Sequence, residues 1–329
     1  MDVVESRSTR AAPVVLDDLL SRRLVILSGK GGVGKSVVGS ALALAARARG
    51  KRVLLVEVAA PLEAARHFGV APVGGRETEL QPGLFAVNLR PPAVIEEYVR
   101  HVVKVDLLAR RILDSPVYER FVRAAPGLPE LMVLGKLMVL EEAREGWSRR
   151  PRYDLIVVDA PATGHGLALL KVPQAAAAAV PMGPVGANAR RILALLTDRR
   201  RTALVLVAIP EEMAVVEALE LHRLAADEVG LAPSALILNA CHEPRFSRAE
   251  EAWILERLAE GADGPLARGI RLPAALAAAR RHLRRAKLAR FYHGRLRRAL
   301  RVPILTLPFL FEEELGPDAL RVLAERLEA

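Results

Sequence analysis

Short runs of apolar residues recur along the chain and predict buried β-strands. Most are continuous, without the strict polar alternation of a strand that has one face in water, whereas 84–89 alternates enough to be a strand. The runs lie at 23–27, 52–58, 84–89, 153–159, 202–209, 234–239 and 302–307. Segments with the periodicity of helices lie between and after them, near 37–49, 164–176, 187–197, 211–229, 247–260, 273–299 and 317–328. This order predicts an α/β fold, with a mostly parallel sheet of about seven or eight strands, right-handed crossovers and helices on both faces.

The stretch from 92 to 149 departs from this alternation. It carries only helical periodicity, in segments near 92–114, 117–124 and 128–147 that prolines separate. A purely helical stretch of this length exceeds an ordinary crossover. We therefore predict a single domain over 22–329 with an inserted helical subdomain at about 92–149. Residues 1–21 are expected to form a loose lead-in, with a short helix conceivable at 16–20, and 72–82 is expected to be a loop.

A phosphate-binding loop follows the first apolar run. Residues 24–36 read L-V-I-L-S-G-K-G-G-V-G-K-S, and four of them match the spacing G-x-x-x-x-G-K-[ST]. Glycines let backbone N–H groups point at phosphate oxygens, the lysine reaches the β- and γ-phosphates, and the serine hydroxyl binds Mg²⁺. The helix that follows places its N-terminus on the phosphates. The spacing predicts a P-loop NTPase whose nucleotide contacts come from Gly29, Lys30, Gly31, Gly32, Val33, Gly34, Lys35, Ser36 and Val37.

A carboxylate for the metal is expected at the end of a neighbouring strand, because Mg²⁺ keeps several waters that acids orient. Asp159 ends the apolar run L-I-V-V and fits this role, so Ser36 and Asp159 are the predicted metal ligands. A structural aspartate that caps the next turn is the alternative. The turn A-P-A-T-G-H follows, and the Gly164 N–H could meet the γ-phosphate. His165 is as readily explained as a histidine packed at a helix start.

Composition limits the class of protein. Hydrophobic residues make up 52% of the 329-residue chain, enough for a substantial core. No window holds the roughly eighteen apolar residues that a membrane span needs, and 1–12 lacks the apolar run of a signal peptide. We therefore expect a cytoplasmic protein that is not integral to a membrane. The single cysteine, Cys241, excludes a disulfide or a cysteine-based zinc site within one chain.

The net charge of +10 is concentrated near the C-terminus. Residues 280–301 contain ten Lys or Arg and no acid. A solvated helix face is one interpretation, and a docking surface for an acidic partner or for anionic lipid headgroups is the other. Arginine strongly outnumbers lysine throughout the chain, which resembles a coding bias, and no nucleic acid is expected as a partner.

Several segments together resemble the ArsA-type anion-pump ATPases, a family that also includes the ATPases that target tail-anchored membrane proteins. These segments are K-G-G-V-G-K-S at 30–36, P-G-L-P-E-L at 126–131, D-A-P-A-T-G-H-G-L-A-L-L at 159–170, I-P-E-E at 209–212, I-L-N at 237–239 and L-P-F-L at 307–310. The resemblance runs in order from about residue 22 to the C-terminus. The deviant phosphate loop is highly specific, and the later segments are individually weak.

The resemblance implies a Mg²⁺- and ATP-dependent homodimer that closes face to face around nucleotide. Lys30, the additional lysine early in the loop, would reach the phosphates of the partner subunit, as an arginine finger does elsewhere. Asn239 would contact the adenine edge, and the loop from Pro308 would cover the base. A turn or cap residue at a strand end is the alternative for Asn239.

The chain departs from the family at two kinds of position. Ala59 stands where the family has an aspartate that positions the attacking water, and Glu57 is the nearest acid, as a substitute catalytic residue or a structural partner of a lysine. Slow, partner-dependent hydrolysis is therefore expected. Arsenite needs clustered thiolates that one cysteine does not supply. Met132 and Met138 could line an apolar groove for hydrophobic helices, although ordinary packing explains them as well.

Three functions remain open at this level. The first is an ATPase switch that couples its nucleotide state to an unidentified partner or membrane-protein cargo. The second is a nucleotide-gated binding module with little hydrolysis. The third is a membrane-recruited partition or septum-positioning ATPase, although residues 318–329 are too acidic for the C-terminal membrane helix of that class.

Overall fold

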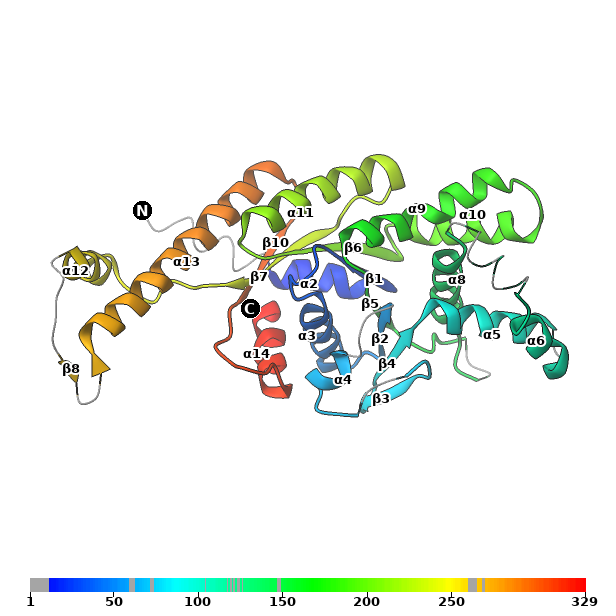
Figure 1. Cartoon of the computed structure of the whole chain (residues 1–329), viewed down its shortest axis with the longest axis horizontal. Coiled ribbons are helices and arrows are strands. Elements are labelled where there is room, and N and C mark those ends of the chain that lie inside the picture. Colours follow the sequence, from blue (N-terminus) through cyan, green and yellow to red (C-terminus); the bar gives the residue numbers. More distant parts are fainter. Residues whose placement is uncertain are drawn as a thin grey trace.

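An eight-stranded sheet forms the centre of the computed structural model (Figure 1). The structure describes residues 12–329 except 59–62, 72–73, 104, 117, 119, 121, 123–124, 126, 147–148, 260–264 and 268–269. The strand order is β10-β7-β6-β1-β5-β2-β4-β3, and all neighbours are parallel except β3 and β4. The strands are β1 (Leu24–Ser28), β2 (Val53–Val58), β3 (Thr78–Gln81), β4 (Leu84–Leu89), β5 (Leu155–Asp159), β6 (Thr202–Ala208), β7 (Ala235–Cys241) and β10 (Ile304–Pro308).

All seven strands predicted from apolar runs are present, and the α/β fold is confirmed. The loop predicted at 72–82 is wrong over its second half, because β3 lies there as an antiparallel edge strand. β3 reads T-E-L-Q, and its Leu80 side chain is the only buried one among its four. A short polar edge strand has no apolar run to reveal it. The small hairpin of β8 (Pro265–Ala267) and β9 (Ile270–Arg271) was not predicted either.

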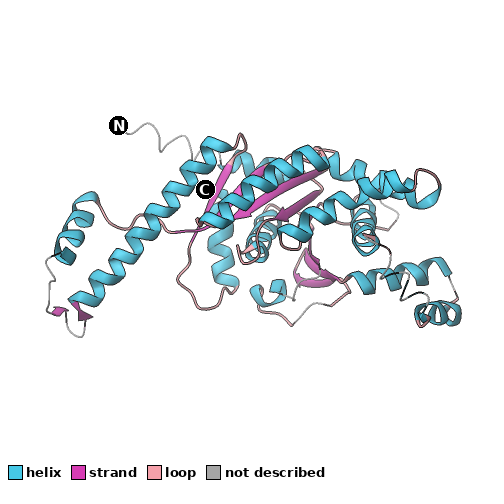
Figure 2. Ribbon diagram, turned by 45° about the horizontal axis from the view of Figure 1, so that its top comes forward, coloured by secondary structure: helices cyan, strands magenta, loops and turns pink. Residues whose placement is uncertain are grey.

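Helices cover both faces of the sheet (Figure 2). Successive residues of β1 alternate between two apolar cores, so that Leu24 and Ile26 face one layer and Val25 and Leu27 face the other. The second layer contains α2 (Ala12–Ser21), α3 (Lys35–Ala48), α4 (Glu63–His67) and α14 (Pro317–Glu328). The first layer contains α8 (Leu128–Glu142), α9 (Thr163–Ala179), α10 (Gly183–Thr197), α11 (Glu212–Leu224) and the C-terminal half of α13 (Leu272–Ala299).

The N-terminal residues that the structure describes are not loose. Leu16, Leu19 and Leu20 of α2 are buried in the second layer, where α2 packs against α14. The short helix that the sequence suggests at 16–20 is therefore present and longer. These leucines form an apolar face, which packing against α14 shields from water.

The helical insertion consists of α5 (Pro91–Val103), α6 (Asp106–Leu113) and α8 in the part of the chain that the structure describes. The single helix predicted at 92–114 is divided, because Val105 is extended and α6 starts after it. Several residues of the helix predicted at 117–124 lie outside the described residues. α5 packs against α8, and α8 packs against α9 and α10.

An ion cluster joins the insertion to the amino edge of the sheet. Glu141 lies at the end of α8 with a side chain only 4% exposed. Arg201, just before β6, forms an ion pair with its carboxylate, and the Arg23 Nε atom before β1 lies 3.4 Å from the Glu141 Oε1 atom. Arg23 also donates to the backbone carbonyl of Glu141 at 2.9 Å. The cluster therefore holds the end of α8 against two central strands.

α12 (Arg248–Ala259) and the N-terminal half of α13 extend beyond the sheet at one end of the molecule (Figure 1). A separate small core of Ile254, Leu276 and Leu283 holds these two helices together. Among the described residues, no helix is both long enough and apolar enough to cross a membrane.

Candidate functional site

The glycine-rich loop joins the end of β1 to the start of α3. Gly29, Gly32 and Gly34 have positive φ angles of 157°, 81° and 83°. A Cβ atom on Gly29 would lie 2.1 Å from the carbonyl oxygen of Val207, and one on Gly34 would lie 2.4 Å from the Asn239 Nδ2 atom. The loop thus lies directly against the ends of β6 and β7. Glycine is required at both positions by the backbone conformation and by the lack of space.

The start of α3 provides backbone donors for an anion. Gly34 precedes the helix, and no side chain caps it. The first N–H groups of a helix have no partner within the helix, and the helix dipole favours negative charge there. The Lys35 Nζ atom donates to the carbonyl oxygens of Gly29 and Lys30 at 3.1 and 3.2 Å. Burial lowers the pKa of Lys35. The negative charges of Asp159 and Glu217 raise it, but by less than burial lowers it. Loop, helix start and ammonium group form a cradle that fits phosphates.

The predicted metal ligands are in direct contact. The Ser36 Oγ atom donates to the Asp159 Oδ2 atom at 2.5 Å, and Asp159 is 4% exposed. The two residues come from α3 and from the end of β5, which is next to β1 in the sheet. Mg²⁺ in such sites uses one or two protein oxygens, with waters and phosphates as the other ligands. A hydroxyl and a carboxylate at the edge of a phosphate cradle fit this ligand set.

Glu57 lies in a row of buried polar residues across the sheet. It is in register with Asp159 on β5 and with Asn88 on β4, so all three side chains leave the same face of the sheet. The Glu57 Oε1 atom accepts a hydrogen bond from the backbone N–H of Ala64 at 2.9 Å, in the first turn of α4. Glu57 is 1% exposed. Glu57 thus lies between Asp159, a predicted metal ligand, and the start of α4. Ala59 lies outside the described residues.

Asn239 and Pro308 lie near the carboxyl ends of two neighbouring strands, β7 and β10. Pro308 of β10 is in register with Cys241 of β7, two residues beyond Asn239. The Asn239 Nδ2 atom donates to the carbonyl oxygen of Val33 at 3.0 Å, so this side chain holds the phosphate-binding loop itself. Ala240 has a φ angle of 54°, which is uncommon for a residue other than glycine. The two residues lie together at the edge where the sheet ends.

The segment after Asp159 turns directly into α9. Gly164 and His165 lie in its first turn, and their side chains are outside the described residues. Gly166, which the sequence interpretation missed, is confined more tightly, because a Cβ atom there would lie 2.8 Å from the Pro161 carbonyl oxygen and 3.1 Å from the Ser28 Oγ atom. Ser28 was also missed. Its buried hydroxyl has no hydrogen-bond partner among the described residues, and its place just before the loop was the available signal.

An aromatic cluster beside Pro308 was not predicted. His242 stacks on Phe309 with ring centroids 4.5 Å apart, and His282 and Phe311 contact it edge-on. Burial lowers the pKa of His242, and the positive charges of Arg285, His282 and Arg245 lower it further. The cluster joins the segments after β7 and β10 to α13. These residues are far apart in sequence, so their proximity had no sequence signal.

Two sequence alternatives are decided by packing. Met138 is buried in the core of the first layer, and Met132 packs against that core, so ordinary helix packing accounts for both. Cys241 is partly buried, and burial together with the charge of Glu243 raises its pKa to about 12. A thiol with this pKa is a poor nucleophile and a poor metal ligand at neutral pH.

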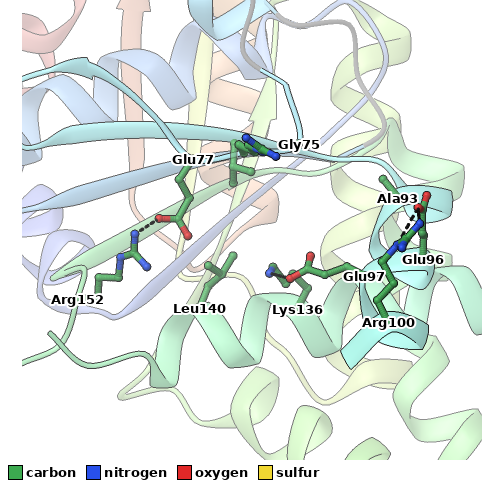
Figure 3. Close-up of a pocket in the computed structure, with 11 residues that line it drawn as sticks. Gly75, Glu77, Ala93, Glu96, Glu97, Arg100, Lys136, Leu140 and Arg152 are labelled. Atoms are coloured by element: carbon green, nitrogen blue, oxygen red, sulfur yellow. Dashed lines mark hydrogen bonds and ion pairs between the residues drawn. The ribbon is translucent and has the colours of Figure 1, made fainter. Parts of the chain in front are cut away.

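A separate cavity of about 590 Å³ lies between β4 and helices α5 and α8 (Figure 3). Its lining carries both signs of charge in close pairs. Glu97 pairs with Lys136, Glu96 pairs with Arg100 at 2.9 Å, and Glu77 pairs with Arg152. Because these charges neutralise one another, the cavity presents no strong field for an ion.

Comparisons with known proteins place the site in a family. The model of a family described as anion-transporting ATPase matches residues 22–183, which include the glycine-rich loop, Glu57 and Asp159. Through this region, the chain belongs to the ArsA-type ATPase family. Its fold is accordingly that of an ArsA-type P-loop NTPase.

Relatives of this ArsA-type chain match it over part of their length. The ATPase BagA of Mycobacterium tuberculosis is 34% identical over 205 residues, which cover 60% of this chain and 59% of that protein. The arsenical pump-driving ATPase of Acidiphilium multivorum is 29% identical over 234 residues, or 65% of this chain and 39% of the relative. One from Escherichia coli is 28% identical over the same lengths. The matched part of the chain thus spans less than two thirds of each of these relatives.

Proposed function

We propose that this protein is a Mg²⁺-dependent ATPase that acts as a dimeric, cytoplasmic switch. The observation that carries the proposal is the contact between Ser36 and Asp159 at the edge of the phosphate cradle. A hydroxyl and a carboxylate at 2.5 Å, next to an uncapped helix start and a lysine, form the set of groups that Mg-nucleotide requires. Relatives with the printed name ATPase support the same activity.

Each residue has a defined task in this proposal. Backbone N–H groups of 29–37 bind the phosphates, and Lys35 holds the β- and γ-phosphate oxygens with its ammonium group. Ser36 and Asp159 hold Mg²⁺, which when bound supplies charge neutralisation for phosphoryl transfer. Asn239 fixes the loop through Val33 and has amide atoms left for the base. The loop from Pro308 covers the base, and the aromatic cluster beside Pro308 supports that loop.

A nucleotide-gated binding module with little hydrolysis is the second candidate. It is favoured by the position of Glu57, since one of its carboxylate oxygens accepts a hydrogen bond from Ala64. A carboxylate engaged in this way is less available to orient an attacking water. In this case ATP would change the shape of the protein with very slow turnover. Glu57 and Gly164 remain proposed site residues in both candidates.

Single-turnover hydrolysis at saturating ATP separates the two candidates. We expect slow hydrolysis in the parent, and an increase of about tenfold or more in Ala59→Asp, because a carboxylate would then be present to position water. ATP affinity, measured by titration with a fluorescent analogue, should be similar in both. Brisk hydrolysis by the parent without a partner, together with no gain in Ala59→Asp, would contradict this account of residues 57–59.

Lys30 is the proposed contact between subunits. Its side chain forms no ion pair or hydrogen bond with another described residue, although its carbonyl oxygen accepts from Lys35. We expect Lys30→Ala to bind ATP with nearly parental affinity but to lower turnover by about 100-fold or more, since a cation supplied in trans stabilises the transition state. ATP-dependent dimerisation, followed by light scattering, should weaken in parallel.

Lys51→Ala is a suitable control for this prediction, because Lys51 lies before β2 at the opposite edge of the sheet. It should leave turnover and dimerisation unchanged. If Lys30→Ala dimerises and hydrolyses ATP like the parent, Lys30 has no role in trans.

The partner or cargo is proposed to act through the helical insertion. An anion such as arsenite is disfavoured as cargo, because the chain has one cysteine and its thiol is protonated. An unidentified protein or membrane-protein cargo suits the exposed apolar side chains of Val105, Leu107 and Leu108 in the insertion better. The partition or septum-positioning alternative is disfavoured by α14, whose apolar face of Leu320, Leu323 and Leu327 is buried against the second layer.

A further inference from the structure

The entire net charge of the protein falls on one stretch of α13 and the turn after it. The chain has 48 basic and 38 acidic residues, and residues 280–301 hold ten of the basic ones and no acid. The remaining residues are therefore neutral in sum, with 38 of each sign. A general excess of arginine would spread over the surface, whereas this charge lies on α13 and the turn after it.

Five arginines of α13 lie on one face of the helix. Leu276, Leu283, Ala286, Ala289, Tyr292 and Leu296 are buried and turn toward the body of the protein or toward α12. Positions separated by four or seven residues share a face of a helix. The outer face therefore carries Arg280, Arg284, Phe291 and Arg298 in one row, with Arg281, Leu288 and Arg295 beside them. We call these seven residues the basic face.

Ion pairs do not neutralise the basic face. None of its five arginines forms an ion pair with another described residue. Lys287 lies in the same row, seven residues after Arg280 and four before Phe291, but its charge is paired with Glu251 of α12 at 2.6 Å, so it is not counted in the basic face. Exposed arginines elsewhere do have acidic neighbours, as Arg191 has Glu142 at 2.9 Å and Arg321 has Asp318 at 3.0 Å.

Two apolar side chains are exposed in the middle of these arginines. Phe291 is 57% exposed and Leu288 is 39% exposed. Phe291 has arginines seven residues before and after it, and Arg295 one turn away. Arg280 and Arg298 are about 27 Å apart along the axis at 1.5 Å per residue. The face is thus a straight row of cations with an aromatic centre, on a helix that extends beyond the sheet (Figure 1).

We propose that the basic face of α13 docks on an anionic membrane surface. Helices that lie on membranes combine arginine and lysine with aromatic and leucine side chains, because the cations meet lipid phosphates and the apolar groups enter the headgroup boundary. A duplex nucleic acid would use the cations and leave Phe291 and Leu288 without a role. The proposal does not depend on the proposed ATPase activity, since the basic face contains no residue of the nucleotide site.

Vesicle co-sedimentation of the full chain tests this proposal. The parent should bind vesicles of phosphatidylcholine with phosphatidylglycerol, should not bind pure phosphatidylcholine, and should be released by high salt. Each cation near an anionic surface raises the affinity for vesicles about fivefold. The double variant with Arg284→Gln and Arg298→Gln should therefore bind anionic vesicles about 25-fold more weakly. Phe291→Ser keeps every charge and should weaken binding by about fivefold.

Matched controls keep the experiment interpretable. Arg199→Gln with Arg200→Gln removes two exposed arginines between α10 and β6 and should bind vesicles like the parent. ATP affinity should be unchanged in all variants, which also reports that they are folded. The proposal is overturned if the parent ignores anionic vesicles, if the Arg284 and Arg298 variant binds them as well as the parent, or if that variant loses affinity only for duplex DNA or an acidic polypeptide.

Discussion

Replacing Lys35 with alanine is expected to lower the affinity for ATP by about 100-fold or more. In the structure the ammonium group is held over the loop by the carbonyl oxygens of Gly29 and Lys30, and no acid side chain of the described residues is hydrogen-bonded to it. Charge-assisted bonds to phosphate are about twice as strong as neutral ones, and here they form in a partly buried site. Titration with a fluorescent ATP analogue measures the loss directly.

The Lys35→Ala variant should remain nearly as stable as the parent. Its side chain donates only to loop carbonyls, so the free energy of unfolding should change by less than about 1 kcal/mol. Lys51→Ala serves as the charge-matched control and should bind ATP normally. Near-parental ATP affinity in a folded Lys35→Ala protein would exclude the glycine-rich loop as the phosphate site.

Replacing Glu141 with alanine is expected to destabilise the protein by about 2–4 kcal/mol. The carboxylate is buried between Arg23 and Arg201, and its removal leaves two guanidinium groups in a partly buried place without their acid. Removing one partner of a buried ion pair typically costs about 3–5 kcal/mol. The estimate here is smaller, because Arg23 keeps its bonds to backbone carbonyls and Arg201 is partly exposed. Urea denaturation measures the change.

Glu142 is the control for this prediction, since it is the next residue on the same helix. It pairs with Arg191, and both side chains are exposed, so Glu142→Ala should change stability by about 0.5 kcal/mol or less. Equal effects at both positions would mean that the buried cluster contributes no more than a surface ion pair. A loss confined to Glu141 would show that the insertion is anchored there.

Local patterns predicted the central strands well, because a parallel strand covered on both faces needs a continuous apolar run. The failures have the same physical origin. β3 is a polar edge strand with one buried leucine, so it carries no such run. The break between α5 and α6 has no glycine or proline to mark it, and the chain extends at Val105 although the periodicity continues.

The candidate site also combines residues that local spacing predicts with contacts that it does not predict. Spacing alone predicts the residues of the glycine-rich loop, because each needs a particular backbone freedom or a particular charge at a fixed distance along the chain. It was not sufficient for Asn239, whose amide holds the loop from 206 residues away. Nor did it predict that Glu57 would accept a hydrogen bond from α4, or that His242 would stack on Phe309.

The sequence by itself determined the class of the protein: the apolar runs specify a parallel sheet, the spacing of 29–36 predicts a phosphate loop, and the concentration of charge at 280–301 is visible without coordinates. Only the tertiary structure decided which of these features meet. It brings Asp159 into hydrogen-bond contact with Ser36 and Asn239 into hydrogen-bond contact with the loop. It also buries Met138 and the apolar face of α14, and leaves Phe291 exposed among arginines. The reason is physical, since local patterns report how each residue restricts its own backbone, whereas contacts and exposure depend on how the packed elements are arranged in space.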